Sequence, residues 1–174
     1  MRKGIVAVIG LWFILLVVGC SSDEQNEVKA NNDIKKMVQK YSASKTEDVS
    51  ASITSHELIV KDEQDKEIIY DLSKEDFFVS IAPFVKDTHP CEIHSLTGCQ
   101  GELANKEFDV MIKDKDGKVI IDKKIKSLEN GFIDVWLPRD QTFKVKIQYG
   151  ERISESAIST FKGDHTCITT MQLI

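Results

Sequence analysis

The sequence predicts an α+β fold, in which a small unit of one helix and one β-hairpin precedes a mainly antiparallel, β-sandwich-like domain. Apolar residues repeat with a helical period only near residue 40, whereas from Glu107 onwards they alternate with polar residues as in half-buried strands. Turn signals recur at regular intervals between these strands, which is typical of sandwiches. We therefore expect an N-terminal unit over residues 33–75 and a β domain over residues 76–174.

The start of the chain is typical of a bacterial lipoprotein signal peptide. Two basic residues precede sixteen uncharged ones, and Val17-Val18-Gly19-Cys20 has the pattern of a lipobox. Residues 1–19 are predicted to be removed and Cys20 to be lipidated, with residues 20–32 as a lipidated cysteine and flexible tether. The apolar run is shorter than the roughly twenty residues of a spanning helix, so an uncleaved anchor is the weaker alternative. Both interpretations place the rest of the chain outside the cytoplasm.

The charge of the processed chain excludes some classes of partner. Removal of Arg2 and Lys3 lowers the number of basic residues from 23 to 21 against 28 acidic ones, so the formal charge moves from −5 to −7. Excess negative charge argues against binding to nucleic acid or to anionic lipid. The chain also has no glycine-rich phosphate loop and no internal repeat.

The N-terminal unit is predicted from one apolar stripe and one hairpin. A helix over residues 33–42 is indicated by a cap at Asn32 or Asp33 and by apolar residues at i, i+3, i+4 and i+7. These are Ile34, Met37, Val38 and Tyr41. Strands over residues 53–60 and 67–72 flank a charged turn and are predicted to pair. The unit has little core of its own, so we expect it to pack on the rest of the chain or on a second copy.

The β domain is predicted strand by strand. The apolar run over residues 77–85 is interrupted by Pro83, which favours a bend at its end. Asp116-Gly117 and Asn130-Gly131 predict tight turns. The remaining strands are expected over residues 107–113, 119–125, 132–137, 143–149, 153–161 and 167–173.

A long segment without periodicity, residues 86–102, separates the first of these strands from the others. It contains two thiols and two imidazoles, those of Cys91, Cys99, His89 and His94. Loops of this length inside compact domains are usually functional or disordered. The number of soft ligands in the segment favours function. Its acidic side chains are interpreted as solvating the loop; they are Asp87, Glu92 and Glu102.

Three thiols remain once Cys20 is lipidated, namely Cys91, Cys99 and Cys167. An odd number of thiols outside the cytoplasm cannot all pair within one chain, so either one stays free or the three share another partner. His89 and His165 each stand two residues before a cysteine, and in an extended chain such residues point to the same side. If the last strand borders the long loop, the three sulfur atoms converge.

A metal ion is the partner that such a set of thiols suits best. Thiolates select Cu(I), Zn(II) and iron–sulfur clusters, and clusters need four protein ligands at denser spacing. Zinc would take the three cysteines and one histidine as a tetrahedron, whereas Cu(I) accepts two or three sulfurs without a fourth ligand. His94 is the favoured additional ligand over His89 and His165. His56 is interpreted as a surface residue and Met171 as a core residue.

Four segments carry a resemblance to a known family. They are Phe77–Phe84 (FFVSIAPF), Cys91 with His94–Thr97 (HSLT), Cys99–Leu103 (CQGEL) and Thr166–Leu173 (TCITTMQL). Together they resemble the CueP family of extracytoplasmic copper-binding proteins, with three cysteines in the same order. The resemblance runs from about Phe77 to the C-terminus and is looser over residues 33–72.

The resemblance implies copper binding, copper resistance and thiol–disulfide interplay among Cys91, Cys99 and Cys167. In fold it implies an N-terminal domain similar to the dimerisation domain of disulfide isomerases, followed by a β domain that carries the thiols. The expected partners are a copper ion, the membrane through the lipid anchor, a copper-receiving protein or disulfide reductase, and a second copy in a homodimer. Nucleic acid is not expected.

The combined hypothesis is a lipid-anchored extracytoplasmic protein that holds Cu(I) on Cys91, Cys99 and Cys167 with help from His94, for sequestration, resistance or delivery. It is not expected to be an enzyme, although thiols could reduce Cu(II) while forming a disulfide. Zinc is the alternative metal. Another alternative is an accessory protein for thiol–disulfide exchange, against which the missing Cys-x-x-Cys counts. A structural disulfide, Cys99–Cys167 or Cys91–Cys99, is the simplest alternative.

Overall fold

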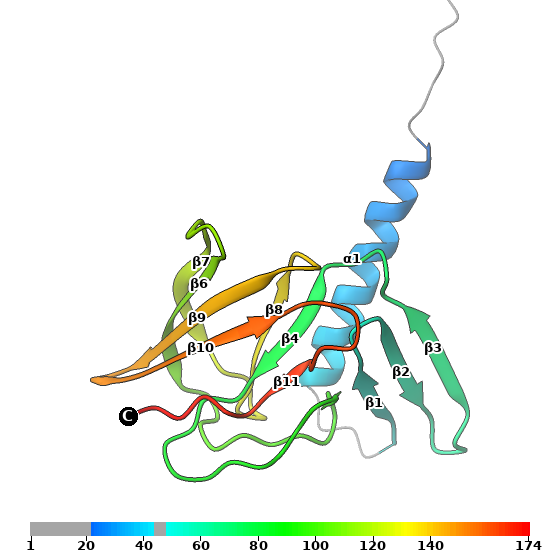
Figure 1. The fold of residues 1–174 in the computed structure, drawn as a ribbon. Helices are drawn as coiled ribbons and strands as arrows, with labels where there is room; N and C mark the ends of the chain where they lie inside the picture. Colours follow the sequence, from blue (N-terminus) through cyan, green and yellow to red (C-terminus); the bar gives the residue numbers. More distant parts are fainter. Residues whose placement is uncertain (1–21, 44–47) are drawn as a thin grey trace, which may run out of the picture.

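The computed structural model describes residues 22–43 and 48–174, so the predicted signal peptide and Cys20 lie outside the described residues. Over these ranges the chain is mostly antiparallel β-sheet, with one helix on its N-terminal side (Figure 1). The predicted α+β class therefore holds in part, because the helical portion is small. No helix in the described ranges combines the length and the apolarity that crossing a membrane requires.

The helix, α1 (Ser22–Ala43), is longer than the sequence predicted and begins within the segment assigned to a flexible tether. Its predicted portion packs as expected, with Val38 fully buried and its apolar neighbours against the same cluster. The additional turns were missed because Val28 is their only valine, leucine, isoleucine or aromatic residue, so no apolar stripe marks them. Acidic residues near the start of a helix favour it through the helix dipole, and Asp23 and Glu24 stand there.

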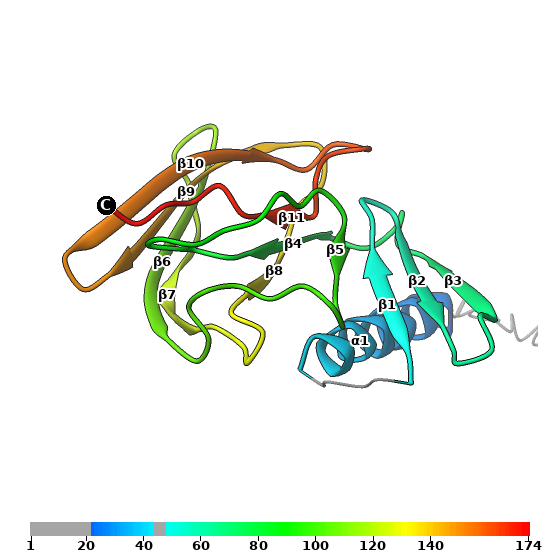
Figure 2. The ribbon, with the colours of Figure 1, turned by 90° about the horizontal axis from the view of Figure 1, so that it is seen from below.

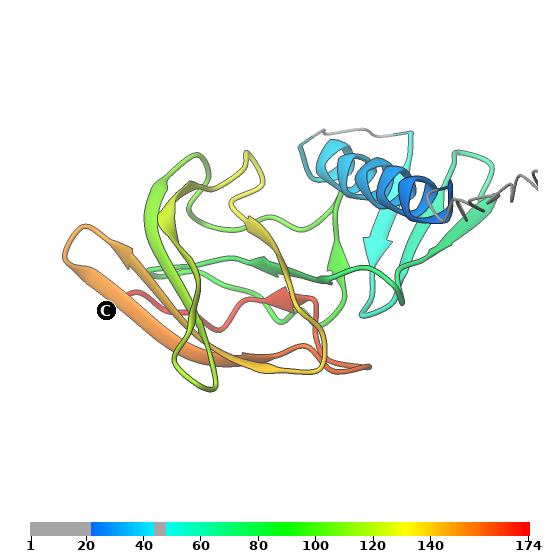
Figure 3. The same cartoon turned by 90° about the horizontal axis from the view of Figure 1, so that it is seen from above.

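The sheet that packs on α1 has the strand order β3-β2-β1-β5. Its strands are β1 (Ser50–Ile53), β2 (Glu57–Lys61), β3 (Glu67–Asp71) and the short β5 (His94–Ser95). Figure 3 shows α1 lying across one face of β1, β2 and β3. Leu58 and Leu72 are among the residues that close the core between them.

One predicted strand, over residues 53–60, is in fact two strands separated by a turn. The turn is held by the Thr54 hydroxyl oxygen, which accepts hydrogen bonds from the backbone N–H groups of His56 at 3.3 Å and Glu57 at 3.0 Å. A threonine side chain can close such a turn without glycine or proline. The sequence prediction was wrong here because no glycine or proline marks the turn within residues 53–60.

Two further sheets share a single hydrophobic core. One has the order β10-β9-β6-β7 and the other β11-β4-β8. Side chains from both sheets form the core, including Phe77, Phe108 and Phe143, each with no exposed surface. This is the packing that a sandwich requires. The strands are β4 (Phe77–Ile81), β6 (Glu107–Asp114), β7 (Val119–Lys126), β8 (Ile133–Leu137), β9 (Thr142–Tyr149), β10 (Arg152–Ser159) and β11 (Cys167–Ile168).

The last strand is shorter than the sequence predicted. The sequence predicted residues 167–173, but β11 covers only Cys167–Ile168 and pairs parallel to β4. Beyond it, a single bridge joins Gln172 to Phe84. The alternation of buried and exposed residues continues after the strand ends, with Met171 and Leu173 in the core, so burial and not pairing produced the signal.

Strand pairing and side-chain hydrogen bonds are among the contacts that join the N-terminal sheet to the rest of the chain. His94 and Ser95 of β5 pair with Ile53 and Ser52 of β1, which docks the long loop on this sheet (Figure 2). On the other side the Arg139 guanidinium donates to three backbone carbonyls, those of Ser55, Leu72 and Glu75. The helix and hairpin thus pack on the rest of the chain, which is one of the two arrangements that the sequence predicted. A boundary near residue 75 stays a prediction.

Candidate metal centre

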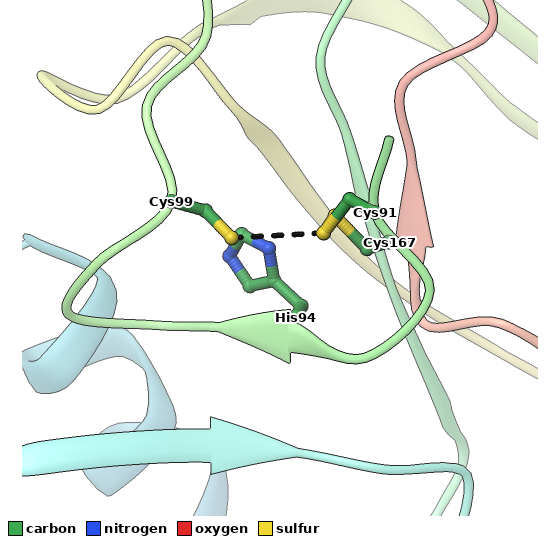
Figure 4. Close-up of side chains that lie close together, drawn as sticks. All are labelled: Cys91, His94, Cys99 and Cys167. Atoms are coloured by element: carbon green, nitrogen blue, oxygen red, sulfur yellow. Dashed lines mark hydrogen bonds between the residues drawn. A yellow bond between two sulfur atoms is a disulfide. The ribbon is translucent and has the colours of Figure 1, made fainter. Parts of the chain in front are cut away.

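Four side chains from the long loop and the last strand meet beside the N-terminal sheet: Cys91, His94, Cys99 and Cys167 (Figure 4). The sulfur atoms and the imidazole donor all lie within 4.8 Å of one another. Cys91 comes just before β5, His94 lies in it, Cys99 follows it and Cys167 begins β11. The structure therefore brings together the four residues that the sequence singled out.

The position of Cys167 depends on β11. Cys167 lies opposite Ser80 of β4, in the parallel pair, and is 1% exposed. The backbone N–H groups of Thr166 and Cys167 both donate to the carbonyl oxygen of Glu92, at 3.0 and 3.2 Å. These bonds tie the strand to the residue that follows Cys91. The last strand borders the long loop, as convergence of the sulfur atoms requires.

Cys91 and Cys167 are joined by a disulfide, with 5.6 Å between their Cα atoms. This pairing is neither of the two considered from the sequence, Cys99–Cys167 and Cys91–Cys99. Disulfide connectivity cannot be deduced from sequence alone. Here it follows from the docking of β11 on the loop.

Cys99 is the free thiol among the described residues. Its backbone N–H donates to the Ser95 carbonyl at 3.0 Å, which closes the turn after β5, and its Sγ lies 3.6 Å from the Cys91 Sγ. Burial raises the pKa of the Cys99 thiol, and a backbone hydrogen bond with Ser95 acts in the opposite direction. At this separation the three sulfur atoms could share one metal ion once the disulfide is reduced.

His94 is the most unusual residue of the group. Its side chain has no exposed surface, and neither ring nitrogen has a hydrogen-bond partner. The ring lies 4.6 Å from that of Phe132 and 6.1 Å from that of Phe78, while its backbone N–H donates to the Thr166 hydroxyl. Buried polar atoms are nearly always paired, so an unpaired imidazole beside three sulfurs calls for an explanation. A metal ion would supply a partner for one of the two ring nitrogens.

The protonation state of His94 suits that role. Burial, with a smaller contribution from His89, lowers the pKa of His94 from 6.5 to about 4. The ring is therefore neutral at neutral pH, which is the form that ligates metals. The donor set of three sulfurs and one neutral nitrogen fits both Cu(I) and Zn(II).

The other candidates lie outside this group. His89 is half-buried with its ring 6.4 Å from that of Phe132, and His165 is exposed. His56 is half-buried on the turn between β1 and β2. Met171 is 1% exposed and packs in the core of the two larger sheets, as the sequence predicted.

Glu102 positions the loop, a role that sequence reasoning missed. One of its carboxylate oxygens accepts the backbone N–H groups of Val85, Lys86 and Asp87 at 2.6, 3.0 and 3.4 Å. The bonds from Lys86 and Val85 lower the pKa of the Glu102 carboxyl. They join the segment that leads to Cys91 to the segment that follows Cys99. The signal that could have revealed this role was the Gln-Gly-Glu sequence directly behind Cys99.

A second constraint on the Cys99 segment is a backbone crossing at Gly101 and Gly131. The Gly101 N–H donates to the Asn130 carbonyl at 2.6 Å. Gly131 has φ +82°, and a Cβ atom there would collide with the backbone of Gly101. Position 131 therefore needs glycine, whereas a Cβ atom at position 101 would make a tight contact, 3.0 Å from the Gly131 carbonyl oxygen.

Comparisons with known proteins identify the family of this chain. Residues 33–172 match the family model described as periplasmic copper-binding protein CueP. A solved structure titled "Crystal Structure of S.CueP" is similar over 90% of this chain and 100% of its own, with 34% sequence identity and a TM-score of 0.77. No match was found among curated proteins. The family match includes the helix and hairpin, where the sequence resemblance was looser, and on these findings the chain belongs to the CueP family of periplasmic copper-binding proteins.

Proposed function

We propose that this protein is lipid-anchored on the extracytoplasmic side of the membrane and binds Cu(I) through the thiolates of Cys91, Cys99 and Cys167, with His94 as fourth donor. Its role would be sequestration, resistance or delivery of copper. The observation that carries the proposal is the buried, unpaired imidazole within 4.8 Å of the sulfur atoms. Membership of a copper-binding family favours copper over zinc for the same donors.

On this proposal the protein cannot bind the metal while the Cys91–Cys167 disulfide is intact, because the disulfide sulfurs are not thiolates. Reduction of the disulfide takes two electrons and two protons and yields two thiols. The thiols then lose their protons as they bind the metal. A disulfide reductase would supply the electrons and a copper-receiving protein would take the ion onward. The lipid anchor at Cys20 rests on the lipobox sequence.

The first prediction concerns the affinity for copper. In an anaerobic titration against a competing chelator, the reduced soluble form (residues 21–174) is expected to bind one Cu(I) tightly. Cys91→Ser, Cys99→Ser and Cys167→Ser are each expected to weaken binding by about a hundredfold or more, because each removes a thiolate that copper prefers to oxygen. His89→Asn is the matched control, since His89 lies outside the group.

Two results would overturn the proposal. One is an affinity no higher than that of an unstructured thiol peptide. The other is an affinity that the three serine variants leave unchanged. In either case the cysteines would serve as disulfide formers.

The second prediction concerns Glu102. Glu102→Ala is expected to weaken Cu(I) binding by about tenfold, the scale at which outer-shell partners act on metal sites. The loss should persist at pH 5, because the lowered pKa keeps the Glu102 carboxylate ionised in the folded protein down to acid pH. Asp87→Ala is the control, an exposed carboxylate in the same loop. Equal affinities of the two variants would show that the three hydrogen bonds do not position the site.

The alternative, thiol–disulfide exchange on protein substrates, rests on the free Cys99 thiol 3.6 Å from the disulfide sulfur of Cys91. Against it, burial raises the pKa of the Cys99 thiol, whereas efficient exchange needs a thiolate. An insulin-reduction assay separates the two functions. Turnover without copper would favour exchange.

A further inference from the structure

A second group of metal-binding side chains surrounds a separate cavity next to the thiol site. The cavity has a volume of about 250 Å³ and is formed by the β1–β2 turn, the loop before β5 and the segment before β11. Two histidines and two acidic residues are among those that line it: His56, His165, Glu92 and Asp164. The thiol site uses none of the four.

One backbone–backbone hydrogen bond and two that involve the Ser55 and Thr166 hydroxyls hold the three segments around this cavity. The Gly163 N–H donates to the Ser55 hydroxyl oxygen at 3.0 Å, and the Thr166 N–H donates to the Glu92 carbonyl at 3.0 Å. The Thr166 hydroxyl also donates to the Ile53 carbonyl at 2.6 Å. The cavity wall is therefore built by the fold and does not depend on the placement of exposed side chains.

A hydrogen bond with Ser55 sets the orientation of the His56 ring. Its Nδ1 lies 2.8 Å from the hydroxyl oxygen of Ser55, a residue that is only 3% exposed. The Ser55 oxygen can accept one hydrogen bond from Nδ1–H and another from the Gly163 N–H, since a hydroxyl has two lone pairs. With Nδ1 protonated, the lone pair of Nε2 is free. A partner of this kind is what orients histidine ligands in metal sites.

We propose that this cavity is a second metal site, which binds a divalent ion of the Zn(II) or Cu(II) class through His56 and His165, with Glu92 and Asp164 as oxygen donors. Imidazole and carboxylate suit such ions, whereas Cu(I) prefers the sulfur atoms of the inner site. One Asp164 oxygen already accepts the Phe161 N–H at 2.7 Å, which leaves the other for a ligand. The site goes beyond the Cu(I) function proposed above.

This second site, called the outer site, is open, and its ion would be held less tightly than an ion bound by the thiols of the inner site (Cys91, Cys99 and Cys167). In the part of the chain that the structure describes, the cysteine and histidine group is the one whose donor atoms are already gathered closely enough to hold an ion. The exposed side chains of His165 and Glu92 must turn toward the ion. Thr166 lines the cavity and accepts the His94 N–H, so the two sites share a wall. An ion held here would stand next to the inner site.

The test uses protein in which no thiol is free. In a Cys20→Ser, Cys99→Ser background with the Cys91–Cys167 disulfide intact, the inner site retains no thiolate, so failure of the Cu(I) proposal does not affect the result. Zn(II) titration by calorimetry is expected to show one saturable site. His56→Asn and His165→Asn are each expected to weaken it by about tenfold or more. His89→Asn is the matched control.

The second measurement is electron paramagnetic resonance of the same protein with one equivalent of Cu(II). The spectrum is expected to show coupling to imidazole nitrogen, and His56→Asn and His165→Asn are each expected to reduce that coupling. A circular dichroism spectrum equal to that of the wild type would establish that the fold of each variant is intact. The absence of a saturable Zn(II) site would overturn the proposal. So would an equal effect of His89→Asn, or a Cu(II) spectrum unchanged by His56→Asn and His165→Asn.

Discussion

The substitution His94→Leu is expected to stabilise the metal-free protein and, at the same time, to weaken its binding of Cu(I). The His94 side chain is fully buried and both ring nitrogens lack partners. A buried polar group left unpaired costs about 1–3 kcal/mol, and leucine has a similar volume without the polar atoms. Loss of a fourth donor should lower the Cu(I) affinity by about tenfold or more. Denaturant unfolding and chelator competition measure the two effects.

The pH dependence provides a second readout for the same substitution. The pKa of His94 is lowered from 6.5 to about 4, so between these values the unfolded chain binds a proton that the folded chain does not. The stability of the metal-free wild type should fall by about 3 kcal/mol as the pH drops from 6.5 to 4, at 1.36 kcal/mol per unit of pKa. His94→Leu should remove this part of the pH dependence, whereas His89→Leu should leave most of it.

Two outcomes would contradict this interpretation of His94. Wild-type Cu(I) affinity in the leucine variant would remove the imidazole from the ligand set. A metal-free variant less stable than wild type would show that the contacts of the ring with Phe78 and Phe132 outweigh the cost of burying its nitrogens.

The substitution Gly131→Ala is expected to be among the most destabilising single changes in the chain. A methyl group would collide with the Gly101 backbone, at a residue whose φ of +82° already disfavours alanine. Strain of this kind costs of order 1–3 kcal/mol, and separation of the segments also loses the Gly101–Asn130 hydrogen bond. We expect a loss of about 3 kcal/mol or more in the free energy of unfolding. Denaturant unfolding of the metal-free protein measures it.

Gly117→Ala is the matched control, because Gly117 has φ +83° and no other atom lies within 4 Å of the place that its methyl group would take. It should show the backbone strain alone, about 1 kcal/mol. Equal losses at the two glycines would mean that the crossing at Gly101 yields easily. Gly131→Ala should also weaken Cu(I) binding, because Gly101 lies two residues after Cys99 and would be displaced.

Much of the β domain was predictable because its signals are local. Strands β6, β7 and β9 agree with their predicted ranges to within one residue at each end. Alternation of polar and apolar residues reports which face of a strand is buried, and Asp-Gly and Asn-Gly turns report where the chain reverses. The helical stripe of residues 34–41 was visible for the same reason.

The sequence by itself determined which metal ligands the protein offers: the thiols of Cys91, Cys99 and Cys167, the histidine beside them and the family motifs that contain them. Only the tertiary structure decided which cysteines pair, that His94 is buried without a partner, that Glu102 clamps the loop and that Gly131 meets Gly101. The physical reason is that each of these depends on contacts between segments far apart in the chain. Residue type and spacing specify which ligands are present, whereas the docking of β11 on β4 and of β5 on β1 specifies which of them meet.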